Sequence, residues 1–171
     1  MLTPGQKVPN LDLPLTIQAR FKLSQQTPDN FTMLVFYRGQ HCLICRKYLE
    51  EIGGRLDDFT SRGISVFAVS MDSEERAQIA DEEWATLDLP LVYDLSEQQA
   101  RDWGLYISEK REGSDEPDIF SEPGLFLMRP DLSLYFAVTQ NAPFTRPSLD
   151  QLLQGVDHVL KDHYPARGTR G

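Results

Sequence analysis

The chain has 171 residues, 40% of them hydrophobic and 10% aromatic, so it can bury one sizeable core and is not disordered as a whole. Its 26 acidic and 17 basic residues give a formal net charge of −9, which repels phosphate backbones and excludes nucleic acid as an expected partner. No apolar run approaches the roughly 20 residues that span a bilayer, and the first residues lack a signal-peptide layout. We therefore expect a cytoplasmic protein with no membrane partner.

The first 30 residues are rich in proline, glycine, asparagine and aspartate, which favour turns, with room for a short strand around residues 21–23. Residues 31–37 then form a nearly continuous apolar run of strand length, which is typical of a strand buried on both faces. Residues 64–69 show the same pattern. The sequence thus predicts two buried strands with one segment between them.

That intervening segment carries a helical stripe. Apolar residues recur at steps of four and three from Cys45 to Phe59, which keeps them on one helix face, and Gly63 is suited to end the helix. After the second buried strand, Asp72 or Ser73 can cap a helix that runs to about residue 85.

The second half of the chain alternates in the same way. We expect a short strand at residues 91–93 and a helix capped by Ser96 that stops near Gly104. Residues 108–122 are predicted to form a charged, solvated loop, with a lid over the active site as the alternative.

The chain closes with a predicted hairpin of two apolar runs, residues 124–128 and 132–138, and a final helix capped by Ser148. The order of elements predicts an α/β fold: a central mixed sheet flanked by helices on both faces. We expect one domain over residues 1–164 and a flexible tail over residues 165–171.

Cys42 and Cys45 are the only cysteines, and they lie between the first buried strand and the striped helix. A bridge that closes so small a loop stabilises little, and a reducing compartment argues against a structural disulfide. The first turn of a helix stabilises a thiolate, lowering the pKa of a thiol from about 8.5 to between roughly 3.5 and 7.5. The second cysteine, one turn on, can resolve a mixed disulfide. The pattern indicates a redox-active dithiol.

Three neighbouring residues are candidates for tuning this pair: Arg38 and Arg46 through positive charge, and His41 next to Cys42. The alternative for each arginine is a solvated surface position, and the alternative for His41, a lone histidine before a loop, is no role at all. Three alternatives to redox work remain: inert core cysteines, a zinc site and a Cys-His hydrolase. The zinc site lacks a second pair of ligands and the hydrolase lacks an evident third residue, so no metal and no other cofactor is predicted.

The sequence resembles the thioredoxin superfamily and, more narrowly, the peroxiredoxin-like branch of the alkyl hydroperoxide reductase/thiol-specific antioxidant (AhpC/TSA) family. The likeness runs from Pro-Gly-Gln-Lys-Val-Pro at residues 4–9 to the final helix. The most specific match is Phe-Tyr-Arg-Gly-Gln-His-Cys-Leu-Ile-Cys at residues 36–45, and Gly-Leu-Phe-Leu-Met at residues 124–128 is similar to a later core strand. The resemblance implies a thioredoxin-like fold.

The match fails at informative positions. Peroxiredoxins carry Pro-x-x-x-Thr-x-x-Cys here, which puts Cys45 at the peroxide-attacking position, Cys42 in place of the Thr and Arg38 in place of the Pro. They also carry an Arg before the later core strand, where this chain has Pro123. A Pro there is the thioredoxin pattern, in which it faces the dithiol and is usually cis, so a cis bond is expected at Glu122–Pro123. By the thioredoxin pattern Cys42 attacks; by the peroxiredoxin pattern Cys45 does.

The resemblance implies an antioxidant oxidoreductase that acts by thiol–disulfide exchange, by peroxide reduction, or by both, with the missing donors favouring exchange. Its substrate would be a small peroxide or a protein disulfide, and its reductant a thioredoxin or glutathione system. It also suggests a homodimer, although the sequence shows no clear exposed apolar patch. The alternative from another class is a binding or chaperone-like module that kept the fold and lost catalysis.

Overall fold

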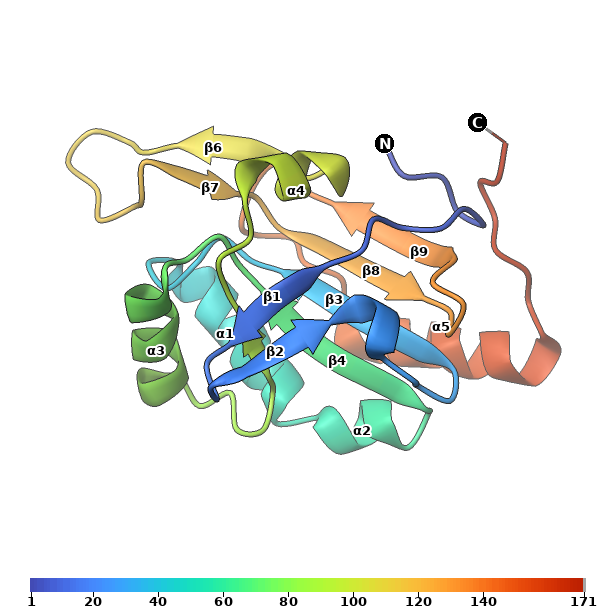
Figure 1. Ribbon diagram of the computed structural model, residues 1–171. Helices are drawn as coiled ribbons and strands as arrows, with labels where there is room; N and C mark the ends of the chain where they lie inside the picture. Colours follow the sequence, from blue (N-terminus) through green and yellow to red (C-terminus); the bar gives the residue numbers. More distant parts are fainter. Residues whose placement is uncertain (171) are drawn as a thin grey trace.

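Seven strands form one mixed sheet in the order β2-β1-β5-β4-β3-β8-β9, as seen in the computed structural model, which describes residues 1–170 (Figure 1). The strands of this sheet are β1 (Asp12–Leu15), β2 (Ala19–Lys22), β3 (Phe31–Phe36), β4 (Ile64–Val69), β5 (Leu91–Val92), β8 (Gly124–Met128) and β9 (Leu134–Thr139). The helices are η1 (Leu23–Gln25), α1 (Leu43–Gly53), α2 (Leu56–Thr60), α3 (Glu74–Glu83), α4 (Glu97–Asp102) and α5 (Leu149–Asp162).

Strand β3 is the centre of the fold. It pairs in parallel with β4 and antiparallel with β8, and all six of its residues are buried. Apolar side chains on both faces can be buried because α1, α2 and α5 pack on one face of the sheet, while α4 and the N-terminal segment pack on the other. The predicted α/β architecture, with a mixed sheet between helices, is confirmed.

Local signals placed most elements correctly. Ser73, Ser96 and Ser148 cap α3, α4 and α5, each accepting a backbone N–H three residues ahead. The single helix predicted from Cys45 to Gly63 is wrong, because it is divided into α1 and α2 at Gly53–Gly54. A Cβ at Gly53 would lie 2.2 Å from the carbonyl oxygen of Thr86. The glycine is therefore required by a close approach of another segment, and two glycines in succession weaken the helix there.

Residues 108–122 are more ordered than a solvated loop. They form most of a separate two-stranded sheet of β6 (Ile107–Glu109) and β7 (Ile119–Ser121), which projects from one side of the molecule (Figure 1). Two carboxylates in this segment, Glu116 and Glu122, are buried. The solvated-loop prediction is wrong for these two residues because Arg38, from elsewhere in the chain, and Arg111, from the segment itself, offset their charges.

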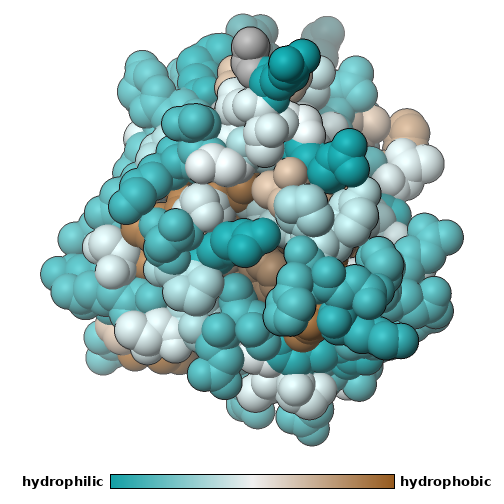
Figure 2. All heavy atoms as spheres, turned by 90° about the vertical axis from the view of Figure 1, so that its right-hand side faces the viewer, coloured by the Kyte–Doolittle hydropathy of each residue, from teal (hydrophilic) through white to brown (hydrophobic). Residues whose placement is uncertain are grey.

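The two ends of the chain lie close together (Figure 1). Residues 165–170 contain no helix or strand, and Gly168 approaches Pro4. The flexibility of this tail, like the homodimer, stays a prediction. On the side of the molecule in Figure 2, hydrophobic residues are visible mainly in recesses between hydrophilic ones. Within residues 1–170, no helix combines the length and the apolar character needed to cross a membrane.

Candidate active site

Cys42 is the N-cap of helix α1, at the carboxyl end of strand β3. The backbone N–H of Cys45 donates a hydrogen bond to the Cys42 sulfur at 3.2 Å. Both thiols are free and buried, Cys45 more completely than Cys42. The structure thus places the two sulfurs at the positively polarised end of a helix, as the sequence predicted.

The two thiols differ in acidity. The pKa of Cys42 is lowered to about 6, first by a hydrogen bond from the Cys45 thiol and then by the Cys45 backbone N–H and two arginines, against an opposing effect of burial. The pKa of Cys45 is raised well above its usual value, mainly by burial. Cys42 is therefore the sulfur that carries negative charge near neutral pH.

Arg146 touches the second sulfur. Its Nη2 donates a hydrogen bond to Cys45 Sγ at 3.0 Å, and its guanidinium lies 5.3 Å from the centre of the Tyr48 ring. The charge of Arg146 also lowers the pKa of both thiols. The sequence analysis missed this residue, whose only local signal is its place just ahead of the α5 cap.

A short loop between β9 and α5 presents Arg146. The side-chain amide of Gln140 donates to the carbonyl oxygens of Phe144 and Thr145, at 2.9 and 2.5 Å. Thr145 has a φ of +60°, an unusual conformation for a β-branched residue. The Gln140 amide thus secures a strained turn immediately before the arginine.

Arg38 is the other cation beside Cys42. It forms ion pairs with Glu116 at 3.4 Å and Glu122 at 3.3 Å, and its guanidinium stacks 4.6 Å from the centre of the Phe120 ring. All three partners belong to the β6–β7 segment. Glu116 also pairs with Arg111, whose backbone N–H is the main cause of a Glu116 pKa lowered to about 2. These contacts explain why two carboxylates of this charged segment, Glu116 and Glu122, can be buried.

His41 lies beside the pair but carries no charge at neutral pH. Burial, followed by the positive charge of Arg38, lowers its pKa to about 4. Its ring packs edge-on against Phe120 at 4.9 Å, and neither ring nitrogen has a hydrogen-bond partner among residues 1–170. Tuning of Cys42 by a charged His41 therefore has no geometric support.

Two further candidates lie elsewhere. Arg46 pairs with Glu50 at 2.8 Å and donates to the carbonyl oxygen of Glu83, and so is directed away from the sulfurs. Pro123 is buried between β7 and β8 and does not line the hollow at Cys42. The expected cis bond at Glu122–Pro123 is wrong: every peptide bond of the described residues is trans. Trans is the lower-energy form, and here backbone bonds of Glu122 and Pro123 carry the chain straight from β7 into β8.

A hollow of about 230 Å³ borders Cys42. One wall is the first turn of α1 with the exposed side chains of Leu43 and Ile44, and the opposite wall is the β6–β7 segment from Arg111 to Glu116. The segment thus borders the same hollow as Cys42, and the lid alternative stays a prediction. Among residues 1–170 there is no group of three or more His, Cys, Asp or Glu side chains arranged to hold a metal ion.

Comparison with known families gives one match over most of the chain: the model of the AhpC/TSA family matches residues 4–136. Alkyl hydroperoxide reductase C from two strains of Helicobacter pylori is 24% identical over 173 residues, covering 98% of this chain and 81% of each relative.

Solved structures share the fold at low identity. The reduced 2-Cys peroxiredoxin of Plasmodium vivax superposes with a TM-score of 0.76 at 16% identity, covering 95% of this chain and 99% of that one. Peroxidoxin BcpB from Mycobacterium tuberculosis gives 0.72 at 18%, covering 96% and 99%. A peroxiredoxin 6 of Arenicola marina gives 0.77 at 18%, covering 95% and 76%. The thioredoxin-like fold expected from the sequence is confirmed.

Proposed function

The chain belongs to the AhpC/TSA family of thiol-dependent oxidoreductases, and on that premise we propose that it reduces peroxides through a dithiol cycle in which Cys42 attacks and Cys45 resolves. One observation carries the assignment of roles. The Cys42 sulfur caps helix α1 and accepts the Cys45 N–H at 3.2 Å, with its pKa lowered to about 6, while the pKa of the buried Cys45 is raised. The thiolate is the nucleophile in this chemistry, so the acidic thiol attacks.

The cycle has two steps inside the protein. The Cys42 thiolate attacks one oxygen of the peroxide, the O–O bond breaks, and the leaving alkoxide or hydroxide takes up a proton to become an alcohol or water. This leaves a sulfenic acid on Cys42. The Cys45 thiol then attacks that sulfur, the S–O bond breaks, and water leaves as the Cys42–Cys45 disulfide forms. Two equivalents of an external thiol, from a thioredoxin or glutathione system, restore the dithiol.

The two arginines supply the positive charge that this chemistry needs. Peroxide reduction builds negative charge on the leaving oxygen, and preorganised donors stabilise such charge best. The family's Thr and Arg are absent from their expected positions, but Arg38 borders the hollow at Cys42 and Arg146 donates to Cys45 Sγ. The missing donors therefore no longer argue against peroxide as the substrate.

Thiol–disulfide exchange with a protein is the second candidate, favoured by a separate observation. Leu43 and Ile44, the two residues between the cysteines, are 69% and 45% exposed, and Phe144 in the neighbouring loop is 60% exposed. Exposed apolar side chains beside a nucleophile suit a polypeptide substrate better than a small hydroperoxide. In this reaction the Cys42 thiolate attacks a substrate sulfur, one substrate thiolate leaves, and Cys45 releases the other.

A side-by-side assay tests both functions. The reduced protein is given hydrogen peroxide, an organic hydroperoxide or insulin under matched conditions, and the consumption of thiol is followed for the wild type and both single-cysteine variants. We expect turnover of peroxide that requires Cys42, and a dimedone adduct of the sulfenic acid on Cys42 in Cys45→Ser. A dimedone adduct formed on Cys45 and never on Cys42 would contradict the assignment of roles. Turnover of insulin without turnover of either peroxide would replace the first function by the second.

A further inference from the structure

Asp72 is a buried acid beside the active-site loop, and the dithiol cycle does not use it. It lies between strand β4 and helix α3, and only 2% of its surface is exposed. Helix α3 is capped by the next residue, Ser73. The carboxylate is therefore not required as a helix cap, and its burial calls for another reason, because an acid is rarely buried without a partner.

Its partner is the loop that leads to Cys42. Asp72 Oδ2 accepts the backbone N–H of Gln40 at 2.7 Å. The neighbouring Gly39 has a φ of +133°, and a Cβ built there would lie 2.5 Å from Asp72 Oδ1. A glycine is thus required at position 39 for two reasons. Residues with a side chain rarely adopt this backbone conformation, and the Asp72 carboxylate lies where a Cβ would be.

The loop transmits this contact to the sulfur. The backbone N–H of Cys42 donates to the carbonyl oxygen of Gly39 at 3.0 Å, closing a turn over residues 39–42. The end of that turn is the N-cap position from which the Cys42 sulfur accepts the Cys45 N–H. The residue that Asp72 holds, Gln40, thus lies inside the turn that ends at the N-cap residue, Cys42.

Charge alone does not explain the arrangement. Negative charge disfavours a thiolate in its neighbourhood, so the charge of Asp72 is not what favours the Cys42 thiolate. The Arg76 guanidinium lies 3.5 Å from Asp72 Oδ1 and offsets that charge. What remains for Asp72 to contribute is the fixed position of an acceptor oxygen.

We propose that Asp72 is a positioning residue, whose carboxylate fixes the turn at residues 39–42 and so holds the Cys42 sulfur over the first turn of α1. The inference rests on the proposed function, since it takes Cys42 to be the attacking thiol. Asp72 belongs to the β4–α3 connection, whereas Cys42 belongs to the β3–α1 connection, so the position of the thiol depends on a second connection of the fold.

The test is the pH profile of Cys42 alkylation by iodoacetamide, read by fragment-ion mass spectrometry on the reduced full-length chain. In Asp72→Ala we expect the midpoint to rise by at least about one pH unit, so that the rate near pH 6 falls at least about fivefold while the alkaline plateau is retained. Asp72→Asn keeps an oxygen that can accept the Gln40 N–H, and we expect its midpoint to stay close to that of the wild type.

Two further variants serve as a control and as a second test of the contact between Asp72 and the loop. Ser73→Ala removes the cap of α3 without touching the loop and is expected to keep the wild-type midpoint. Gly39→Ala disturbs the same contact from the opposite side and is expected to raise the midpoint, so it carries the test if Asp72→Ala does not fold. A folded Asp72→Ala or Gly39→Ala with the wild-type midpoint would overturn the inference. So would a midpoint lowered in both Asp72 variants, which would mean that the carboxylate acts by charge alone.

A failure of the inference is distinct from a failure of the proposed function. If Cys42 in the wild type already titrates like a free thiol, near pH 8.5, the proposed role of Cys42 is contradicted. If the wild type titrates near pH 6 and the variants do too, only the role of Asp72 is lost.

Discussion

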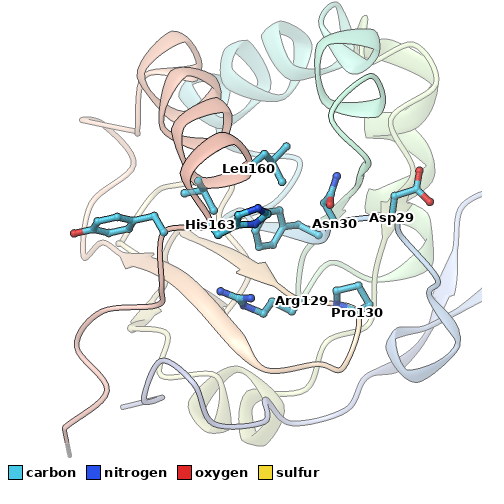
Figure 3. Close-up of a pocket in the computed structure, with 9 residues that line it drawn as sticks. Asp29, Asn30, Arg129, Pro130, Leu160 and His163 are labelled. Carbon is cyan, nitrogen blue, oxygen red and sulfur yellow. The ribbon is translucent and has the colours of Figure 1, made fainter.

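The two ends of strand β3 open onto hollows of different kinds. At its amino end, a hollow of about 300 Å³ lies between Asn30, the β8–β9 turn at Arg129 and the last residues of α5 (Figure 3). At its carboxyl end, the smaller hollow of about 230 Å³ borders Cys42. Of these two hollows, the larger is not the one that borders a cysteine.

The two hollows differ in the helix end that they face: one faces the end of α5 and the other faces the start of α1. The hollow in Figure 3 faces the last turn of α5, where carbonyl groups and negative polarisation gather, and His163 ends that helix with a φ of +50°. The hollow at Cys42 faces the first turn of α1, where N–H groups stabilise a thiolate. Polarity and a nucleophile, rather than volume, thus identify the reactive end.

The largest expected effect comes from Cys42→Ser, which removes the nucleophile. We expect turnover of peroxide to fall by at least about a thousandfold, as when the nucleophile of an enzyme is removed. The matched change at the other end, Arg129→Ala, should leave turnover unchanged. Both are measured as thiol-dependent peroxide consumption. Substantial turnover of peroxide in Cys42→Ser would show that the carboxyl end of β3 does not hold the nucleophile. If a variant without either cysteine kept the full biological function of the protein, the binding or chaperone-like alternative would be favoured.

Cys45→Ser should separate the two steps of the cycle. The first step needs only the Cys42 thiolate, so we expect about one equivalent of peroxide to be consumed per protein. Further turnover should be strongly slowed, since the resolving thiol is gone. Stopped-flow measurement of the burst and of the steady state distinguishes these phases. Loss of the burst together with turnover would instead point to Cys45 as the attacking sulfur.

Arg146→Met should have a smaller effect. It removes the donor to Cys45 Sγ and a positive charge near Cys42, so we expect the rate constant for peroxide reduction to fall about ten- to a hundredfold. Arg46→Met is the control, because Arg46 is on the same helix as Cys45 but points to Glu50. Equal losses in the two variants would show that any arginine near α1 matters equally.

The smallest expected effect is on stability. The pKa of Cys42 in the folded chain, about 6, lies below that of an unfolded thiol, so the thiolate stabilises the fold above the unfolded pKa. This contribution should shrink as the pH falls from about 8.5 to 6. Urea unfolding of reduced wild type and Cys42→Ser at several pH values measures it. A difference between the two proteins that does not change over that range would count against the lowered pKa.

The fold was largely readable from the sequence because its signals are local. Apolar runs marked β3 and β4, and serine caps marked α3, α4 and α5. The dithiol was equally readable, since both cysteines and the strand-to-helix junction lie within a few residues of each other.

The rest of the site depends on contacts between distant parts of the chain. Arg146 is 101 residues from Cys45, and Glu116 is 78 residues from Arg38. The charged segment at residues 108–122 looks solvated when its sequence is considered alone, because the distant Arg38 that pairs with its two buried carboxylates is not part of it. The division of the predicted helix at Gly53 has the same origin, because the carbonyl that requires the glycine belongs to Thr86.

The assignment of Cys42 as the attacking thiol is tested by the reactivity of the two thiols in the wild-type chain as a function of pH. Reduced protein is alkylated with iodoacetamide in short pulses from pH 4 to pH 10, and each cysteine is quantified separately by mass spectrometry. We expect Cys42 to react with a midpoint near pH 6 while Cys45 stays protected to far higher pH. A Cys45 that reacts at lower pH than Cys42 would contradict it.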